Sequence, residues 1–214
     1  MLKSDHIKNG FYTCVDRFGN NLLYRGYDDQ GNKVREKIKY RPELYLPSKN
    51  DDTEWKALDG VPVEPMRFES MSEVRQFEKT YEGVQDFKIY GNTRHIPAFI
   101  QTQFPNEIEY SRANIDVASF DIETSYGDGF PDVDNPTNQI LSIAYKSSRE
   151  DHYRVWGLKP YEVAKTKLSH LNIEYYQFDS EAEMLHDFIG HWSQPEYTPD
   201  VITGWNTRFF DVPY

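Results

Sequence analysis

Residues 11–45 alternate between short apolar runs and polar turns, a pattern typical of antiparallel strands. FYTCV (11–15) and LLYRGY (22–27) flank a turn-like stretch, DRFGNN (16–21). A second turn, DDQGN (28–32), leads into KVREKIKYR (33–41), where charged and apolar residues alternate with a period of two. The pattern predicts a β-rich region whose last strand carries its cationic side chains on one face.

Two helices are predicted from capping boxes that precede helical apolar patterns. Ser70 and Glu73 have capping-box spacing at the start of a helix over 70–82. Ser180 and Glu183 repeat that spacing ahead of a second apolar stripe, formed by Met184, Leu185, Phe188, Ile189 and Trp192. The stretch 87–105 has a mixed pattern that favours neither helix nor strand.

The second half alternates strands with helices. Apolar runs that predict strands, the first of them largely buried, lie at 117–122, 140–145, 153–156 and 201–205. The segment 206–211 turns toward a further helix. This alternation favours an α/β layer fold, and the change of pattern predicts two domains, 1–110 and 111–214.

Composition fits a folded protein outside the membrane. Hydrophobic residues make up 38% of the chain, and no run approaches the roughly 18 apolar residues that span a bilayer. The N-terminus has no signal-peptide pattern, and the single cysteine, Cys14, excludes an internal disulfide. We therefore expect a soluble cytoplasmic protein.

The negative charge is concentrated in the second half. The net charge is −11; residues 1–110 contribute 16 Lys+Arg and 18 Asp+Glu, and residues 111–214 contribute 8 and 17. Such a balance argues against a general polyanion binder, because neutralising phosphates requires Lys and Arg. Surplus carboxylates suit divalent cations, although most of them simply keep a surface solvated.

The basic strand has two interpretations. Five cationic residues share one of its faces: Lys33, Arg35, Lys37, Lys39 and Arg41. They could hold a phosphate backbone, or they could protect a solvated edge strand from aggregation.

Asp121 and Glu123 lie at the end of the first strand of the second half. Side chains two residues apart share a strand face, and close carboxylates repel unless a proton or a cation lies between them. A pair of Mg²⁺ or Mn²⁺ ions about 3.5–4 Å apart is the usual solution in phosphodiester chemistry. Asp211 is the third candidate ligand. An isolated D-x-E is weak evidence, but the apolar lead-in and Asp211 strengthen the metal-site hypothesis.

FDIET (120–124) followed by TGWNTRFFDVPY (203–214) resembles the first two exonuclease motifs of family B, or α-like, DNA polymerases. The finer pattern is similar to the T-even-type phage branch. Further likeness lies at SYGDGFP (125–131), FDSEAEML (178–185), YRPELYLP (40–47) and FKIYGNTR (87–94). The resemblance covers the whole chain, and the paired exonuclease motifs are its most specific part.

The resemblance implies the N-terminal portion of a DNA-directed DNA polymerase, α+β overall. A β-rich N-terminal domain (1–110) would precede an incomplete RNase H-like 3′→5′ proofreading exonuclease domain (111–214). Asp121 would bridge two Mg²⁺ or Mn²⁺ ions, Glu123 would bind the ion that activates water, and Asp211 would hold the second ion. The implied partners are the single-stranded 3′ end of DNA, a primer–template, and the remaining polymerase polypeptide.

Two further residues receive roles from the resemblance. Phe130 would stack on a frayed terminal base, and Asn206 would hydrogen-bond near the substrate strand. From the residues alone, Phe130 could equally pack on the core, and Asn206 could cap a helix.

The third exonuclease motif of the family, Tyr-x3-Asp, supplies a fourth metal ligand and has no counterpart after Asp211. The Tyr-x3-Asp strings at 24–28 and 175–179 precede the second motif, and we interpret them as coincidences. A split polymerase, a truncated product and an excerpt of a longer protein all fit. We predict weak or no nuclease activity from this chain alone. The alternatives are a non-catalytic nucleic-acid-binding or assembly module, and an unrelated nuclease with a fourth ligand such as Asp179 or Asp187.

Overall fold

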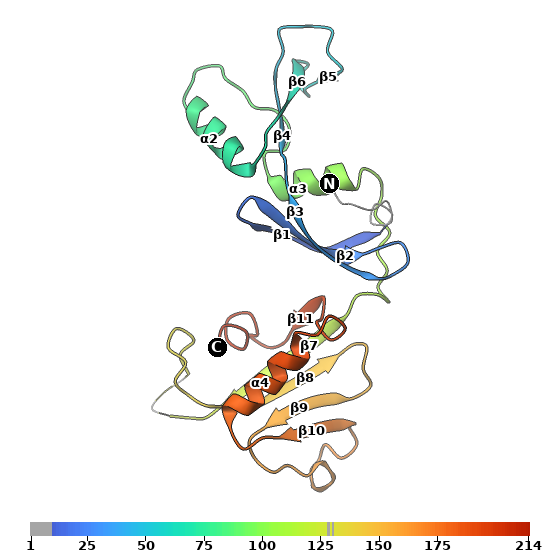
Figure 1. The fold of residues 1–214 in the computed structure, drawn as a ribbon, viewed down its shortest axis with the longest axis vertical. Helices are drawn as coiled ribbons and strands as arrows, with labels where there is room; N and C mark the ends of the chain where they lie inside the picture. The colour runs from blue at the N-terminus through green and yellow to red at the C-terminus, as the bar shows by residue number, and fades with distance from the viewer. Residues whose placement is uncertain (1–9, 128, 130) are drawn as a thin grey trace. The chain divides into compact units, whose positions relative to one another are not determined.

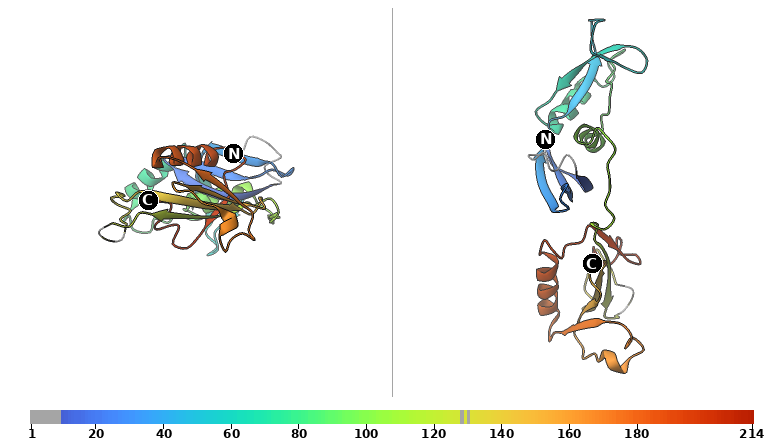
Figure 2. Two further views of the ribbon diagram at one scale, coloured as in Figure 1. Left: turned by 90° about the horizontal axis from the view of Figure 1, so that it is seen from below. Right: turned by 90° about the vertical axis from the view of Figure 1, so that its right-hand side faces the viewer.

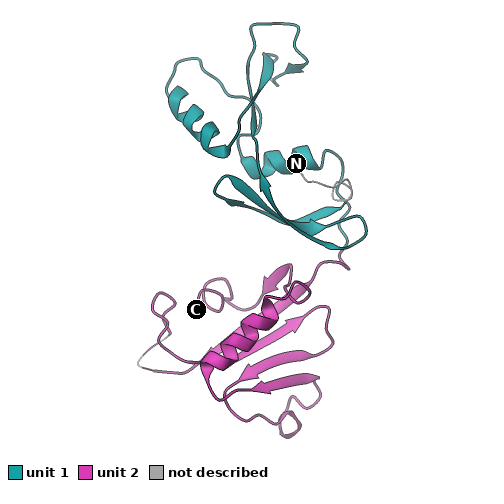
Figure 3. Cartoon of the chain, viewed as in Figure 1, with its two compact units in different colours: residues 1–111 teal, residues 112–214 magenta. Residues whose placement is uncertain are grey.

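The computed structural model describes residues 10–127, 129 and 131–214 (Figure 1). The chain divides into two compact units, residues 1–111 and 112–214 (Figure 3). Both combine helices with β-sheets, which confirms the predicted α+β class. Among the described residues, no helix is long and apolar enough to cross a membrane.

Unit 1 contains an antiparallel sheet in the order β1-β2-β3, as the alternating pattern predicts. Its strands are β1 (Phe11–Phe18), β2 (Asn21–Tyr27) and β3 (Lys33–Lys39). One face buries Leu22, Tyr24 and Ile38 in a core shared with Phe99 of α3 (His95–Gln103). Figure 2 shows α3 on one side of this sheet. The chain thereby covers one face of the sheet and leaves the cationic face of β3 outside the core.

A second small sheet in unit 1 has the order β4-β6-β5. It consists of β4 (Glu43–Pro47), β5 (Trp55–Lys56) and β6 (Pro62–Arg67). The helix α2 (Met71–Tyr81) packs Val74 against Leu44 and Phe68. Ser70 caps α2 by accepting a hydrogen bond from the backbone N–H of Glu73, which confirms the first capping box.

Unit 2 is built on one five-stranded sheet in the order β10-β9-β8-β7-β11. The strands are β7 (Val117–Thr124), β8 (Ile140–Ser147), β9 (Tyr153–Gly157), β10 (Ile173–Gln177) and β11 (Val201–Thr203), with a short turn of helix, η1 (Val163–Lys165), between β9 and β10. β8 is antiparallel to β7 and β9, whereas β10 runs parallel to β9 and β11 runs parallel to β7. β8 is therefore the only strand of this sheet that runs against the others.

The helix α4 (Glu181–Trp192) covers one face of this sheet (Figure 2). Ser180 caps it by accepting from the backbone N–H of Glu183, as predicted. Phe188 and Trp192 pack on Phe120 of β7, with ring centroids 5.6 and 5.7 Å apart. The apolar stripe is only partly buried, because Ile189 is 58% exposed.

β7 differs from the largely buried strand that its apolar lead-in predicts. Ala118, Phe120 and Ile122 are buried under α4, whereas the side chains between them are exposed: Ser119, Asp121 and Glu123. The reason is that α4 covers one face of the sheet only, so β7 alternates between a core face and an open face.

The chain after β11 forms consecutive turns where a helix is predicted. The backbone carbonyl of Asn206 accepts from the N–H groups of Phe209 and Phe210, and Asn206 has a φ of +59°. An N-cap residue has extended backbone angles, so this left-handed geometry does not fit a helix cap. Asparagine tolerates the left-handed region better than most residues do.

Candidate carboxylate site and basic sheet face

β7 places Asp121 and Glu123 on the open face of the unit 2 sheet. Across from them on β8 lie Ala144 and Ser142, neither of which carries a charge. The two acidic residues are two positions apart, so their Cα atoms are about 6.6–7 Å apart along the strand. The strand therefore supplies two carboxylates to one face, at a spacing that leaves room for a third group.

Asp211 reaches β7 from ninety positions downstream. Its Oδ1 accepts a hydrogen bond of 3.0 Å from the backbone N–H of Ile122, the residue between Asp121 and Glu123. β11 pairs with β7 only as far as Thr203 opposite Ser119, so the edge of β7 is open beyond that point. The Asp211 carboxylate satisfies the backbone donor that β11 leaves free.

Two residues that the sequence analysis did not single out bring Asp211 to this position. A Cβ on Gly204 would lie 2.5 Å from the carbonyl oxygen of Phe120, so only glycine allows this close approach. Thr207 is buried, and its hydroxyl donates to the same carbonyl oxygen at 3.4 Å. The Thr-Gly pair before WNT was visible in the sequence, but nothing in a local pattern indicates which backbone it approaches.

Tyr214 fixes the other side of this segment. Its hydroxyl donates to the carbonyl oxygen of Asn138 at 2.6 Å and accepts from the N–H of the same residue at 2.9 Å. Asn138 in turn donates to the carbonyl oxygen of Ser125, just after β7. The segment that carries Asp211 is thus tied to both ends of the loop that follows the D-x-E strand.

The electrostatics around Asp121 and Asp211 are those of carboxylates that could share a cation. Partial desolvation of the Asp121 carboxyl, and then the negative charge of Asp211, raise the pKa of that carboxyl above its ordinary value. Asp211 is 7% exposed, and its Oδ2 is buried with no hydrogen-bond partner among the described residues. A buried carboxylate oxygen without a donor is what a hard cation would satisfy.

The three predicted ligands are not all gathered. No group of three or more His, Cys, Asp or Glu side chains within the described residues is arranged to hold a metal ion. Asp121 and Asp211 are neighbours, whereas Glu123 shares only the strand face with Asp121. The residues present therefore fit a divalent cation in part, with Asp211 acting on Asp121 and with Glu123 on the same strand face as Asp121.

The remaining predicted residues have different positions. Phe130 lies outside the described residues. Asn206 is exposed, in the turn between β11 and Asp211. Asp187 accepts a 2.7 Å hydrogen bond from the indole N–H of Trp156, and Asp179 is exposed before α4. In the part of the chain that is described, neither acid belongs to a metal-binding group.

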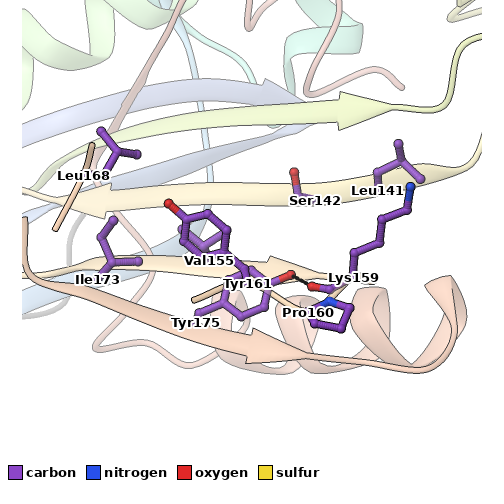
Figure 4. A pocket seen from close by; sticks show the side chains of 9 residues that line it. All are labelled: Leu141, Ser142, Val155, Lys159, Pro160, Tyr161, Leu168, Ile173 and Tyr175. Carbon is purple, nitrogen blue, oxygen red and sulfur yellow. Dashed lines mark hydrogen bonds between the residues drawn. The ribbon is translucent and has the colours of Figure 1, made fainter. Parts of the chain in front are cut away.

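A pocket of about 350 Å³ lies beside β8, β9 and β10 (Figure 4). It is mostly apolar and is lined by Leu141, Ser142, Val155, Lys159, Pro160, Tyr161, Leu168, Ile173 and Tyr175. The Tyr175 hydroxyl donates to the carbonyl oxygen of Lys159. No carboxylate lines this pocket, so it is separate from the acidic site. Tyr175 is the tyrosine of the Tyr-x3-Asp string at 175–179, and this hydrogen bond already uses its hydroxyl.

A second hollow, of about 470 Å³, borders Asp211 itself. Its wall is apolar and includes Phe120 and Phe188, together with three exposed aliphatic side chains: Ile189, Ile202 and Val212. The buried carboxylate thus lies at the edge of an open hydrophobic groove between α4 and the sheet.

β3 is an edge strand, as one interpretation of its charges requires. Arg35, Lys37 and Lys39 are exposed, and Lys33 is partly exposed. Arg41 lies beyond the end of β3 and pairs with Glu69 at 3.0 Å, so it leaves the predicted row. Within β3, the four cationic side chains share one face of the sheet: Lys33, Arg35, Lys37 and Lys39. Ile38 is buried on the other face.

The family model for the exonuclease domain of family B DNA polymerases matches residues 73–214, from α2 onward. The chain is 31% identical over 231 residues to the DNA-directed DNA polymerase of Enterobacteria phage T4, covering 95% of this chain and 24% of that protein. It is 29% identical over 233 residues to the DNA-directed DNA polymerase of Escherichia phage RB69, covering 95% and 25%. It is also 36% identical over 111 residues to the DNA polymerase of Guinea pig cytomegalovirus, covering 45% and 10%.

These matches place the chain in the class of polymerase exonuclease domains. The chain belongs to the family B DNA polymerases, as the two motifs predict. It spans about a quarter of the length of the two phage polymerases.

Proposed function

We propose that this chain is the N-terminal portion of a DNA-directed DNA polymerase and carries part of its 3′→5′ proofreading exonuclease site. Residues 1–110 would form the polymerase N-terminal domain and residues 111–214 the first part of an RNase H-like exonuclease domain. Family membership and the likeness to phage polymerases support this assignment. The protein would act on DNA during replication, in the cytoplasm of a host cell.

One observation carries the proposal. The Asp211 carboxylate lies against the β7 backbone between Asp121 and Glu123, and it raises the pKa of Asp121. The fold brings Asp121 and Asp211 together although they are ninety positions apart in the chain. Placing two like charges side by side costs free energy unless an opposite charge binds between them. That arrangement is expected of a site that recruits a divalent cation to a phosphodiester.

Each acidic residue has a proposed part. Asp121 and Asp211 would hold Mg²⁺ or Mn²⁺ together, with Glu123 completing the ligands on the side open to solvent. When bound, two such ions would polarise the phosphodiester and supply an activated water molecule. The hydrogen bond from Ile122 orients Asp211 for this task, and the open face of β7 gives a DNA 3′ end access to Asp121 and Glu123. Phe130 and Asn206 would contact the terminal nucleotides.

The site would be completed by the rest of the polymerase polypeptide. Three carboxylates are one fewer than the family's exonuclease motifs supply. The open apolar groove beside Asp211 supports a partner segment that packs there and brings the missing ligand. We therefore expect little or no nuclease activity from this chain alone.

The proposal is tested by titrating Mn²⁺ into the 214-residue chain by calorimetry. Binding should be lost in Asp121→Asn and in Asp211→Asn. It should persist in Glu196→Gln, which removes one negative charge from an exposed position that is not one of the three proposed ligands. Unchanged binding in Asp121→Asn would place the metal elsewhere and refute the site. Robust Mg²⁺-dependent degradation of single-stranded DNA by this chain alone would show that the site is already complete, contrary to the proposal.

A second candidate function rests on β3. Lys33, Arg35, Lys37 and Lys39 would bind DNA as a non-catalytic surface of the same polymerase, whether or not the exonuclease site is complete. Their shared exposed face supports this candidate, and the alternative is an edge strand that is merely solvated.

A further inference from the structure

We infer that the open face of the β1-β2-β3 sheet is a binding site for single-stranded DNA, with Phe18 as its stacking platform and Arg25, Arg35, Lys37 and Lys39 as its phosphate contacts. The inference deepens the DNA-binding part of the proposed function. It adds two residues, Phe18 and Arg25, that lie outside β3.

The positive charge of this face extends beyond the edge strand. Arg25 lies on β2, the central strand, directly opposite Arg35 of β3. Both side chains are exposed. Edge protection calls for charges on the edge strand and does not call for a cation on the central one. A surface that binds an anion explains both.

The pairing of Arg25 with Arg35 is unfavourable in isolation. Like charges directly opposite each other on neighbouring strands destabilise a sheet, because their Cβ atoms are only about 4.5–5.5 Å apart. Among the described residues, no carboxylate forms an ion pair with Arg25, Arg35, Lys37 or Lys39. Asp16 is the one acid that the β1 register places on this face, where its Oδ1 accepts from the Arg17 N–H. The face therefore retains a clear excess of positive charge.

An exposed aromatic ring accompanies these cations. Phe18 at the end of β1 is 61% exposed, and the Nζ of Lys37 lies 5.2 Å from the centre of its ring. The register places Phe18 and Lys37 on the same face, on either side of β2. Exposing a phenylalanine has a cost in water, and a solvated edge strand has no use for it.

This combination favours a single strand over a duplex. Single-strand sites pair a cationic groove with aromatic rings on which bases stack, and every base has a face that can stack. A duplex buries its base faces and would offer Phe18 nothing to stack on. Arg35, Lys37 and Lys39 are spaced about 7 Å apart along β3, so they can follow an extended phosphate backbone.

The test is fluorescence anisotropy of labelled dT12 with the 214-residue chain, in EDTA and at several salt concentrations. Replacing Arg35 and Lys37 together by Gln should weaken binding at least tenfold. It should also reduce the slope of log K against log salt by about 1.4, since each phosphate contact to a single strand contributes roughly 0.7. Lys49→Gln, which removes an exposed cation in the loop after β4, is the matched control and should change neither quantity.

Phe18 separates stacking from charge. Phe18→Ala should weaken dT12 binding about 5- to 150-fold and leave the salt slope unchanged, because stacking releases no counterions. Phe18→Tyr should restore the affinity. Unchanged affinity in Phe18→Ala, or in the double Gln variant, would overturn the inference. Tighter binding of a blunt duplex or of the matching RNA would also overturn it.

A failure here is distinguishable from a failure of the exonuclease proposal. Binding of dT12 in EDTA is measured without any contribution from bound metal ions, whereas the exonuclease proposal is measured by Mn²⁺ binding. Binding of dT12 that appears only when Mn²⁺ is added would locate the DNA at the carboxylates and overturn the sheet-face site.

Discussion

β3 and β7 are built on the same plan and carry opposite charges. Each buries one face under a helix, with Ile38 in the core of unit 1 and Phe120 in the core of unit 2. Each exposes alternate charged residues on the other face, cations on β3 and carboxylates on β7. A strand that is covered on one side only can therefore present a row of like charges without disturbing its core.

The two strands differ in where the repulsion comes from. On the unit 1 sheet, the cation facing Arg35 is Arg25 of the neighbouring strand. On β7, the charge facing Asp121 is Asp211, which is buried and comes from a distant segment. Exposed charges spread over an open sheet face suit a long flexible polyanion, whereas a buried carboxylate beside an exposed one suits a small cation. The difference indicates which ligand each face would bind.

The largest expected effect tests the feature that β3 and β7 share, a buried apolar face packed under a helix. Phe120→Ala should lower the free energy of unfolding by about 3–5 kcal/mol, because it removes a buried ring that packs on Phe188 and Trp192. Ile38→Ala should cost about 2–5 kcal/mol in the core of unit 1. Urea unfolding followed by circular dichroism measures both. Ser119→Ala, on the open face of β7, should stay within about 0.5 kcal/mol. A small loss in either core variant would contradict the common plan.

A smaller effect should separate the two roles of Asp211. Asp211→Ala removes the acceptor for the Ile122 N–H and should cost about 1–3 kcal/mol, because that donor would be buried without a partner. Asp211→Asn keeps an oxygen at the Oδ1 position and should cost clearly less. Both variants should lose Mn²⁺ binding. Equal destabilisation by the two substitutions would mean that the hydrogen bond does not hold the segment in place.

The sequence predicted the elements whose signals are local. The capping boxes of α2 and α4 are confirmed because Ser70 and Ser180 act on donors only three residues away. β3 is confirmed because a period of two is readable over seven residues. α3 was not predicted, since Arg94 gives it no side-chain cap and Pro97 lies in its first turn. β4 and β6 were not recognised as partners because a charged loop separates them.

The candidate site was harder to predict than its parts. Asp121 and Glu123 were visible as a D-x-E after an apolar run, but their open face depends on where α4 packs. The approach of Asp211 depends on the contact of Gly204 and Thr207 with the Phe120 carbonyl. That contact joins positions more than eighty residues apart, and no periodic pattern encodes it. The motif likeness predicted which residues belong together, while the physical means of bringing them together became visible only in the fold.

Relieving the cationic repulsion on the unit 1 sheet should stabilise the protein modestly. Arg35→Gln removes the charge opposite Arg25 and should raise the free energy of unfolding by about 0.2–1 kcal/mol at low salt. The gain should shrink as salt is added, because exposed charges are screened. Lys39→Gln is the control, since Lys39 faces the uncharged Asn21. If Lys39→Gln gave the larger gain, the repulsion would not be local to the Arg25–Arg35 pair.

The smallest expected effect concerns the acidic counterpart of that pair and has a definite dependence on pH. Partial desolvation of its carboxyl and the charge of Asp211 raise the pKa of Asp121, so the folded protein binds a proton there more tightly than the unfolded chain does. The stability linked to Asp121 is therefore complete at a pH below its ordinary pKa, and it is lost as the pH rises through the raised value. Asp121→Asn cannot ionise, so it should match the wild type in acid and exceed it near neutral pH. Because Asp121 is an exposed side chain, the gain should stay below about 1 kcal/mol.

Thermal unfolding of the wild type and of Asp121→Asn from acid to neutral pH measures this difference, with Glu196→Gln as the control. Added Mn²⁺ should close the gap by stabilising the wild type alone, and a gain that instead falls as the pH rises would mean that Asp211 does not repel Asp121.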